Sequence, residues 1–213
     1  MRGGLKLGFL ASHGGSSMKA ILDAIAAGTL RASACVVISN NTDAPALAYA
    51  QALGIPAYHL SQTRLGDAAA ADRAISETLA ERGAELVVLS GYLRKLGPRT
   101  LERYRGRILN IHPGRLPAYG GRGMYGRHVH EAVIAAGERR SGITIHLVDE
   151  DYDHGPTLAE REVAVEPGDT PETLGGRIQA LEPHFFVDTL RRIAEGGLVL
   201  PGPGGVAPPG KSA

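Results

Sequence analysis

Two polar segments in the second half of the chain carry residue types that suit acid–base chemistry. In the first, Asn110-Ile111-His112-Pro113, an amide and an imidazole stand two residues apart. In an extended strand this spacing places Asn110 and His112 on one face and Ile111 on the other. The amide can donate a hydrogen bond to a developing oxyanion, and the imidazole can donate or carry a proton near neutral pH. The alternative is that both side chains only bind loop backbone at the end of a strand.

The second segment, residues 149–156, reads Asp-Glu-Asp-Tyr-Asp-His-Gly-Pro. It lacks the spacing and the distal Glu of a calcium loop, so we expect no calcium there. A carboxylate directed at His112 would orient the ring and raise its pKa. The residues alone do not choose among Asp149, Glu150, Asp151 and Asp153, and a solvated turn is the alternative.

A third candidate is the turn Ser12-His13-Gly14-Gly15-Ser16-Ser17 near the start of the chain. Its glycines permit close backbone approach, and the helix expected after it offers free N–H groups to an anion. The spacing matches neither the dinucleotide fingerprint nor the P-loop, so it does not imply a dinucleotide or ATP. A phosphate site and an ordinary strand-to-helix turn explain it equally well.

Short apolar runs alternate with helical patterns through the first half of the chain. Strands are expected at 7–11, 34–39, 55–59, 86–89 and 108–111, and helices at 17–27, 44–53 and 67–82. This alternation predicts an α/β fold with a doubly wound, mostly parallel, Rossmann-like sheet. Ligands of such sheets bind beyond the carboxyl ends of the strands, where the glycine-rich turn and Asn110 both fall.

The second half predicts an antiparallel C-terminal extension of that sheet. It has a loop at 113–126, a helix at 128–136, strands at 142–148 and 158–165, and a long helix at 171–195 with Thr170 as its N-cap. We expect a single domain over residues 1–200. The Pro/Gly-rich stretch 201–213 is expected to be a disordered tail.

The composition is that of an ordinary globular protein, with 43% hydrophobic residues and a formal net charge of +1. Neither nucleic acid nor a membrane is expected as a partner, because there is no basic excess and no apolar run of ~18 residues. The start of the chain does not resemble a signal peptide, so the cytoplasm is the expected compartment. Cys35, the single cysteine, lies in an apolar run and is expected to be a buried thiol. No cysteine or histidine spacing indicates a metal site.

Taken together, these segments resemble the glycinamide ribonucleotide formyltransferases, which depend on folate. The turn at 12–17 is followed, in the order of that family, by LSGYLRKL at 89–96, NIHP at 110–113 with Leu116-Pro117, GITIH at 142–146 and YDHGP at 152–156. The resemblance covers roughly residues 6–200. Asn-x-His-Pro with a distant Asp-x-Gly-Pro is specific to folate-dependent formyltransferases, and the Gly/Ser turn favours the glycinamide ribonucleotide branch.

The resemblance implies a formyl transfer from N10 of 10-formyltetrahydrofolate, as co-substrate, to the amine of glycinamide ribonucleotide in purine biosynthesis, without a metal. Asn110 would stabilise the tetrahedral oxyanion, His112 would act as the acid, and Asp153 would raise the pKa of His112. The chain would bind small molecules only, as a monomer or a homodimer.

The resemblance also implies the residues that bind the two substrates. Those for the phosphate and ribose of the ribonucleotide would be Gly15, Ser16, Ser17 and Glu182. Those for the folate pterin, which would bind largely through backbone, would be Leu93, Arg94, Lys95 and Leu96, together with Asn110.

Three features depart from the family pattern. Ser17 stands where the family turn has Asn, and Ala68 stands where an Arg lies near the folate site. The glycine-rich loop 119–127 is longer than in the best-known members. It is either a lid, in which Arg122 or Arg127 supplies the missing cation, or a rigid surface loop or oligomer contact. Arg64 is the nearest other candidate for that cation.

Other formyl handlers are the main alternatives. A methionyl-tRNA formyltransferase would need an RNA-binding C-terminal domain, and a formyltetrahydrofolate hydrolase would carry an N-terminal regulatory domain. An amino-sugar formyltransferase is disfavoured by the Gly/Ser turn. A non-catalytic nucleotide-binding module would make the coincidence of Asn110, His112 and Asp153 accidental.

Overall fold

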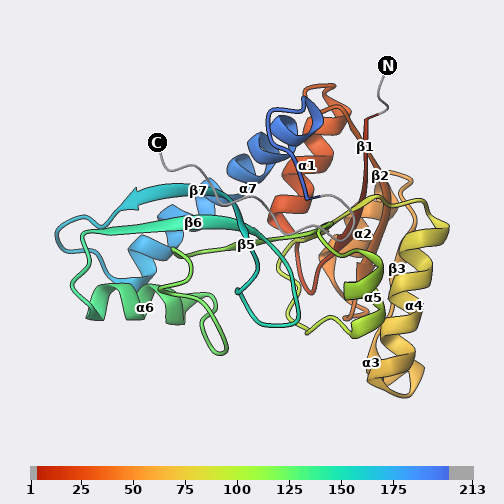
Figure 1. Ribbon diagram of the computed structural model, residues 1–213, viewed down its shortest axis with the longest axis horizontal. Coiled ribbons are helices and arrows are strands. Elements are labelled where there is room, and N and C mark those ends of the chain that lie inside the picture. The colour runs from red at the N-terminus through yellow and green to blue at the C-terminus, as the bar shows by residue number, and fades with distance from the viewer. Residues whose placement is uncertain (1–3, 202–213) are drawn as a thin grey trace.

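A computed structural model describes residues 4–201 of the chain. Seven strands form one sheet in the order β3-β2-β1-β4-β5-β6-β7 (Figure 1). Strands β1 to β5 pair in parallel, whereas β6 and β7 are antiparallel to their neighbours. The predicted mostly parallel sheet with an antiparallel extension is therefore confirmed. The strands are β1 Leu5–Leu10, β2 Ala32–Ser39, β3 Ala57–His59, β4 Leu86–Leu89, β5 Ile108–His112, β6 Arg140–Leu147 and β7 Thr157–Ala164.

The longer helices lie where the sequence patterns predict them, and their ends differ from the predictions by at most one residue. The short helices α3 and α5 were not predicted, because four and six residues are too few to show a helical period. The helices are α1 Ser16–Ala26, α2 Pro45–Ala52, α3 Gln62–Leu65, α4 Ala68–Glu81, α5 Pro98–Arg103, α6 Arg127–Ala135 and α7 Pro171–Ala194.

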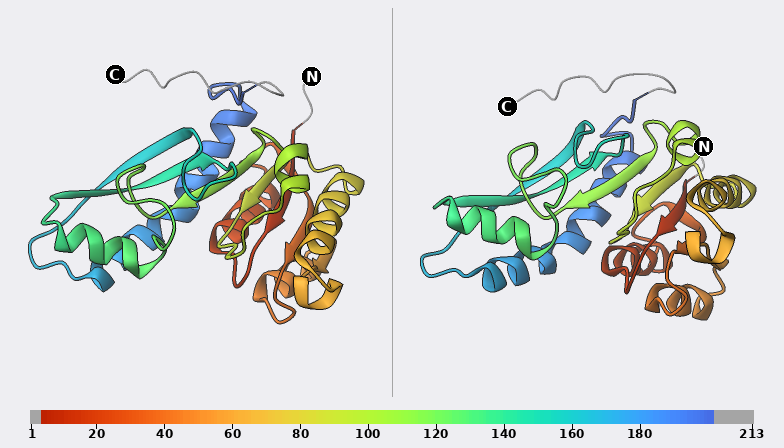
Figure 2. Two further views of the ribbon diagram at one scale, coloured as in Figure 1. Left: turned by 60° about the horizontal axis from the view of Figure 1, so that its bottom comes forward. Right: turned by 90° about the horizontal axis from the view of Figure 1, so that it is seen from below.

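Helices cover both faces of the parallel part of the sheet (Figure 2). On one face, Leu7 and Phe9 of β1 belong to a core cluster that includes Ile21 of α1 and Phe186 of α7. On the other face, Leu10 belongs to a second core cluster, to which residues of α4 and α5 contribute. Because both faces are buried, β2 and β4 read as continuous apolar runs rather than as alternating ones.

The C-terminal helix α7 is anchored at its start and packs across the antiparallel strands. Thr170 caps α7 as predicted: its hydroxyl accepts from the Thr173 N–H, and the Thr173 side chain bonds back to Thr170. Leu174 and Ile178 pack with buried residues of α6, β6 and β7 in a third cluster. This packing positions the part of α7 that carries Glu182.

Two expectations need correction. Pro201 is buried, and its carbonyl accepts a hydrogen bond of 2.6 Å from Arg107 Nη1, so it does not belong to a disordered tail. The rest of that predicted tail lies outside the described residues. Cys35 is only half-buried at the edge of the second cluster. Burial raises the pKa of its thiol, against the smaller effect of Lys6, so it is not an activated nucleophile.

Candidate active site

The site lies where the parallel strands end on either side of β1. Strand β1 has β2 on one side and β4 on the other, so the chain leaves β1 at the switch point of the sheet. Ligands of open α/β sheets bind in the crevice at this point, beyond the carboxyl ends of the strands. The turn 12–17 follows β1, the segment 90–97 follows β4, and Asn110 lies near the end of β5.

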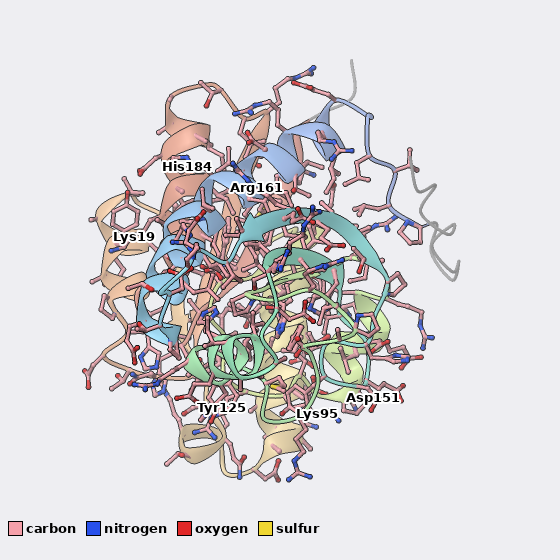
Figure 3. The ribbon with its side chains drawn as sticks, turned by 90° about the vertical axis from the view of Figure 1, so that its left-hand side faces the viewer. Lys19, Lys95, Tyr125, Asp151, Arg161 and His184 are labelled. Carbon is pink, nitrogen blue, oxygen red and sulfur yellow. The ribbon has the colours of Figure 1, made fainter. Side chains whose placement is uncertain are left out.

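A cavity opens beside β5 and collects most of the residues that the sequence assigns to folate. Figure 3 shows two residues that line this cavity, Lys95 and Asp151, on the same side of the molecule. Leu93, in the same segment, does not line the cavity: its side chain is 61% exposed, and its N–H donates to the Ser12 hydroxyl. The cavity is lined by Leu89, Tyr92, Arg94, Lys95, Leu96, Asn110, His146, Val148 and the acidic run from Asp149 to Asp153.

Asn110 is held by a histidine on the next strand. Asn110 and His146 are cross-strand partners in the antiparallel β5–β6 pair, and Asn110 Nδ2 lies 3.1 Å from His146 Nε2. The other nitrogen of the ring, His146 Nδ1, lies 2.9 Å from the Leu147 carbonyl. A carbonyl can only accept, so Nδ1 carries a hydrogen. The charged ring can also donate from Nε2 to Asp153 Oδ1, which lies 3.5 Å away, whereas Nε2 of the neutral ring accepts from Asn110. The second N–H of the amide is thereby left for a ligand.

His112 does not line the cavity and is only 3% exposed. Nδ1 lies 3.5 Å from Asp153 Oδ2, and Nε2 lies 2.6 Å from the Tyr119 carbonyl oxygen. Both nitrogens therefore face oxygen acceptors, which only the protonated ring can satisfy together. Burial lowers the pKa of His112, and this outweighs the raising effects of Asp153 and the Tyr119 carbonyl. The expected effect of Asp153 is thus present, but the net direction of the pKa shift is opposite to the expectation.

Among the acids at 149–153, Asp153 is the one whose carboxylate approaches His112 and His146. Its carboxylate lies 3.5 Å from both His112 Nδ1 and His146 Nε2, and it accepts from the Gly121 N–H at 3.1 Å. Burial alone would raise the pKa of Asp153, but His146, His112 and the Gly121 N–H together hold it below its usual range. The backbone of Asp153 has φ 55, a left-handed conformation that Asp tolerates better than most residues. Asp149 instead bonds the exposed His154.

The glycine-rich turn forms the N-terminus of α1. Gly15 is the N-cap with φ 62, and a Cβ added there would meet Met18 Cβ at 3.4 Å, so this position favours glycine. Ser16 is exposed, whereas Ser17 is only 2% exposed. The hydroxyl of Ser16 is therefore better placed for an anion than that of Ser17, and the missing Asn at position 17 matters less than the sequence suggests.

Glu182, on α7, lies far from this turn in sequence, and its carboxyl group is poorly solvated. Burial raises the pKa of its carboxyl group to about 7. It precedes Pro183, which lies inside the helix. Helix α7, which carries this carboxyl group, packs along α1, the helix that begins at the turn 12–17.

The loop 119–127 is anchored at its start and exposed further on. Tyr119 and Gly121 bond His112 and Asp153 through their backbone groups. Arg127 is paired with Glu131 at 2.6 Å and with Glu172 at 2.7 Å, so it joins the end of the loop to α6 and α7 rather than facing a ligand. Arg64 lines a different cavity of about 380 Å³ beside α2 and bonds the His59 carbonyl, so it does not replace the missing cation at the folate cavity.

Comparison with known proteins decides the family. A model of the family described as "Formyl transferase" matches residues 5–190. The phosphoribosylglycinamide formyltransferase of Bacillus subtilis is 33% identical over 188 residues, which are 88% of this chain and 94% of that protein. The chain belongs to the formyl transferase family.

Further relatives agree with this assignment in sequence and in structure. The chloroplastic phosphoribosylglycinamide formyltransferase of Vigna unguiculata is 36% identical over 194 residues, 91% of this chain but 62% of that longer protein. The crystal structure of glycinamide ribonucleotide transformylase 1 from Symbiobacterium toebii superposes with a TM-score of 0.85 at 35% identity. The superposition covers 95% of this chain and 93% of that chain.

Sequence reasoning missed His146. The segment GITIH was noted only as part of the family pattern, and no role was given to its histidine. A signal was present, since a histidine in an otherwise apolar strand needs a polar partner when it is buried. The partner could not be read from the sequence, because Asn110 is 36 residues away and meets His146 only through strand pairing.

Residues 4–201 show neither a candidate metal centre nor a candidate membrane-spanning helix. Within that range, no group of three or more His, Cys, Asp or Glu side chains is arranged to hold a metal ion. Within the same range, no helix has the length and apolarity needed to cross a membrane.

Proposed function

We propose that this chain transfers the formyl group of 10-formyltetrahydrofolate to the amine of glycinamide ribonucleotide, a step of purine biosynthesis. The observation that carries the proposal is the meeting of Asn110, His112 and Asp153 at the carboxyl end of β5, beside the cavity. The relatives that match over most of their length carry the same activity in their names.

The composition of the cavity fits a reduced folate. Its acids and backbone groups match the N–H donors of a pterin ring, and Tyr152 offers an aromatic face at the rim. Arg94 and Lys95 would contact the pterin largely through their backbone groups, which leaves their cationic side chains for the carboxylates of the folate tail. Leu93 and Leu96 would add apolar contact and backbone groups in the same segment.

Asn110 has the central role in the proposed mechanism. The amine of the ribonucleotide attacks the formyl carbon, and the carbonyl oxygen becomes the oxyanion of a tetrahedral intermediate. The N–H of Asn110 that His146 leaves unused donates to that oxygen. The intermediate collapses when the bond from carbon to N10 breaks, and N10 takes up a proton as the attacking nitrogen loses one.

His112 is the acid of this proposal, and Asp153 keeps its ring oriented and favours its charged form. In the described conformation the Tyr119 carbonyl accepts from His112 Nε2. For His112 to serve the reaction directly, the start of the loop 119–127 must release this nitrogen. Closure of the loop over substrate would break the bond between His112 Nε2 and the Tyr119 carbonyl and let Nε2 donate to the substrate.

The ribonucleotide is proposed to bind at the other end of the crevice. Its phosphate would accept from the backbone and hydroxyl groups of Gly15, Ser16 and Ser17 at the N-terminus of α1. Glu182 would contact the sugar. A carboxyl group with a pKa of about 7 can be either donor or acceptor to a ribose hydroxyl at neutral pH.

One assay separates this function from its rivals. Purified protein is incubated with 10-formyltetrahydrofolate, with and without glycinamide ribonucleotide, while the folate absorbance is followed. Turnover that requires the ribonucleotide supports the transferase. Turnover without it supports a hydrolase, and turnover only with an amino sugar supports that branch. Binding without any turnover supports a nucleotide-binding module. A cytoplasmic location and a monomeric or homodimeric state stay predictions.

A further inference from the structure

Two buried serines tie the turn that follows β1 to the segment that follows β4. Ser12 is 2% exposed and Ser90 is 3% exposed. The Ser12 hydroxyl donates to Asn40 Oδ1 at 2.6 Å and accepts from the Leu93 N–H at 2.8 Å. A hydroxyl has a single hydrogen, and that of Ser12 is used inside the protein. Ser12 therefore belongs to the glycine-rich turn without being a ligand of its anion.

The second tie replaces a missing helix cap. Helix α1 starts after Gly15, an N-cap residue that has no side chain to bind the N–H groups of the first turn. The Met18 N–H instead donates to Ser90 Oγ at 3.0 Å, across 72 residues of sequence. Ser90 thus accepts the hydrogen bond that the side chain of an N-cap Ser or Asp accepts in other helices. The amides of Ser16 and Ser17 precede the first helical hydrogen bond and stay available to an anion.

The backbone joins the same two segments. The Ser12 N–H donates to the Gly91 carbonyl at 3.2 Å, and the Ser90 N–H donates to the Leu10 carbonyl at 2.9 Å. These bonds extend the β1–β4 pairing beyond the strand ends, so the two segments have one common register. A shift of the N-terminus of α1 must move Leu93 as well, or break buried hydrogen bonds.

Leu93 is the first residue of the segment proposed to bind folate, and the turn at 12–17 is proposed to bind phosphate. We propose that Ser12 and Ser90 couple these two sites, so that phosphate bound at the start of α1 fixes the segment 91–96 and strengthens folate binding. Coupling between binding sites is reciprocal, so bound folate strengthens ribonucleotide binding by the same factor. This inference rests on the proposed function, which supplies the two ligands. Both serines are positioning residues, since neither touches a substrate.

The test is calorimetric binding of tetrahydrofolate, the product, which cannot react. Its Kd is measured without and with saturating glycinamide ribonucleotide, and the ratio of the two values reports the coupling. For the unchanged protein we expect the ribonucleotide to tighten binding by about 5-fold or more, the lower end of common allosteric couplings. Ser12→Ala and Ser90→Ala should each bring the ratio close to one. Asn40→Ala removes the acceptor of Ser12, leaves Ser12 itself in place, and should lower the ratio partly.

Ser61→Ala is the matched control. Ser61 is also buried, its hydroxyl accepts from the Arg64 N–H at 3.3 Å at the start of α3, and it does not line the folate cavity. This variant loses the same chemical group and should keep the unchanged ratio, and thermal unfolding verifies that every variant is folded. An unchanged ratio in folded Ser12→Ala and Ser90→Ala, or a ratio of one in the unchanged protein, overturns the coupling. Absence of ribonucleotide-dependent turnover in the unchanged protein contradicts the proposed function instead.

Discussion

Asn110 Nδ2 and His146 Nε2 lie 3.1 Å apart, on residues that are direct partners in the β5–β6 pair. The strand register itself thus sets the orientation of the amide, and the Leu147 carbonyl sets the orientation of the imidazole. An oxyanion donor is effective when it is held in place before charge develops. The β5–β6 pair provides that support from a rigid part of the fold.

The first prediction concerns this support. Asn110→Ala should lower kcat by about 10²- to 10³-fold, the usual cost of losing an oxyanion donor. His146→Ala should lower kcat by less, with little change in either KM, because it only frees the amide to turn. The double variant should be no worse than Asn110→Ala, since the two residues act as a unit. Steady-state kinetics checks this, with the exposed His154→Ala as control. Independent, multiplicative losses would give His146 a role apart from Asn110.

The second prediction concerns His112 and Asp153. His112→Ala and Asp153→Asn should each lower kcat by on the order of 10²-fold or more, with a double variant that loses less than the product. Because the acid must be protonated, kcat should fall as pH rises through the pKa of His112, which burial places below its ordinary value. Asp153 opposes this shift, so Asp153→Asn should move the fall to lower pH. Fully multiplicative losses would exclude Asp153 from this role, and Asp149 and Asp151 would be tested next.

The third prediction concerns the phosphate turn. Gly15→Val should raise KM for the ribonucleotide, because a side chain at φ 62 strains the turn and presses on Met18 and Ala11, which displaces the backbone groups proposed to bind the phosphate. Folate binding measured without the ribonucleotide should change little. Gly14→Ala is the control, since a Cβ there meets nothing within 4 Å. An equal loss of folate affinity in the absence of ribonucleotide would mean that the turn is structural or that the two ligands are assigned to the wrong ends.

The fourth prediction compares cations near the site. Lys95 lies 5.7 Å from the centre of the Tyr152 ring at the folate cavity, whereas Arg127 is paired with two glutamates. Lys95→Ala should raise KM for folate, and salt should reduce the difference from the unchanged protein because it screens a direct charge contact. Arg127→Ala should leave both KM values unchanged. A raised KM in Arg127→Ala, with an unchanged KM in Lys95→Ala, would support Arg127 as the cation that contacts a ligand. Arg122→Ala tests the other arginine of the loop 119–127.

The fifth prediction concerns the stability contribution of Glu182. Its carboxyl group has a pKa raised to about 7, from an ordinary value of 4.5, so the folded protein binds more protons than the unfolded chain between these pH values. Unfolding free energy therefore decreases as pH rises from about 4.5 to 7. Glu182→Gln lacks this dependence and should gain in melting temperature over the unchanged protein as pH rises through that window. Parallel melting curves of the two proteins between pH 5 and 8 would contradict the burial of this carboxyl group.

Much of this protein follows from the sequence because local patterns are enough for it. Continuous apolar runs at β2 and β4 predict strands covered on both faces, and Thr170 before Pro171 predicts the start of α7. The pair Asn110 and His112 could be placed near the end of a strand for the same reason. These features depend on neighbours in sequence, whose spacing decides which face each side chain takes.

The rest depends on contacts between distant segments, which only the tertiary structure decides. Asp153 is the acid of the site because the turn after β6 brings it, and not Asp149, within 3.5 Å of His112. The pKa of His112 is lowered because burial, a property of the whole fold, outweighs one nearby charge. Ser12 belongs to the glycine-rich turn in the sequence, yet its hydroxyl binds Asn40 and the Leu93 N–H instead of facing a ligand. A sequence names the groups that are present, but the partner of each buried group is set by how the strands pair and pack.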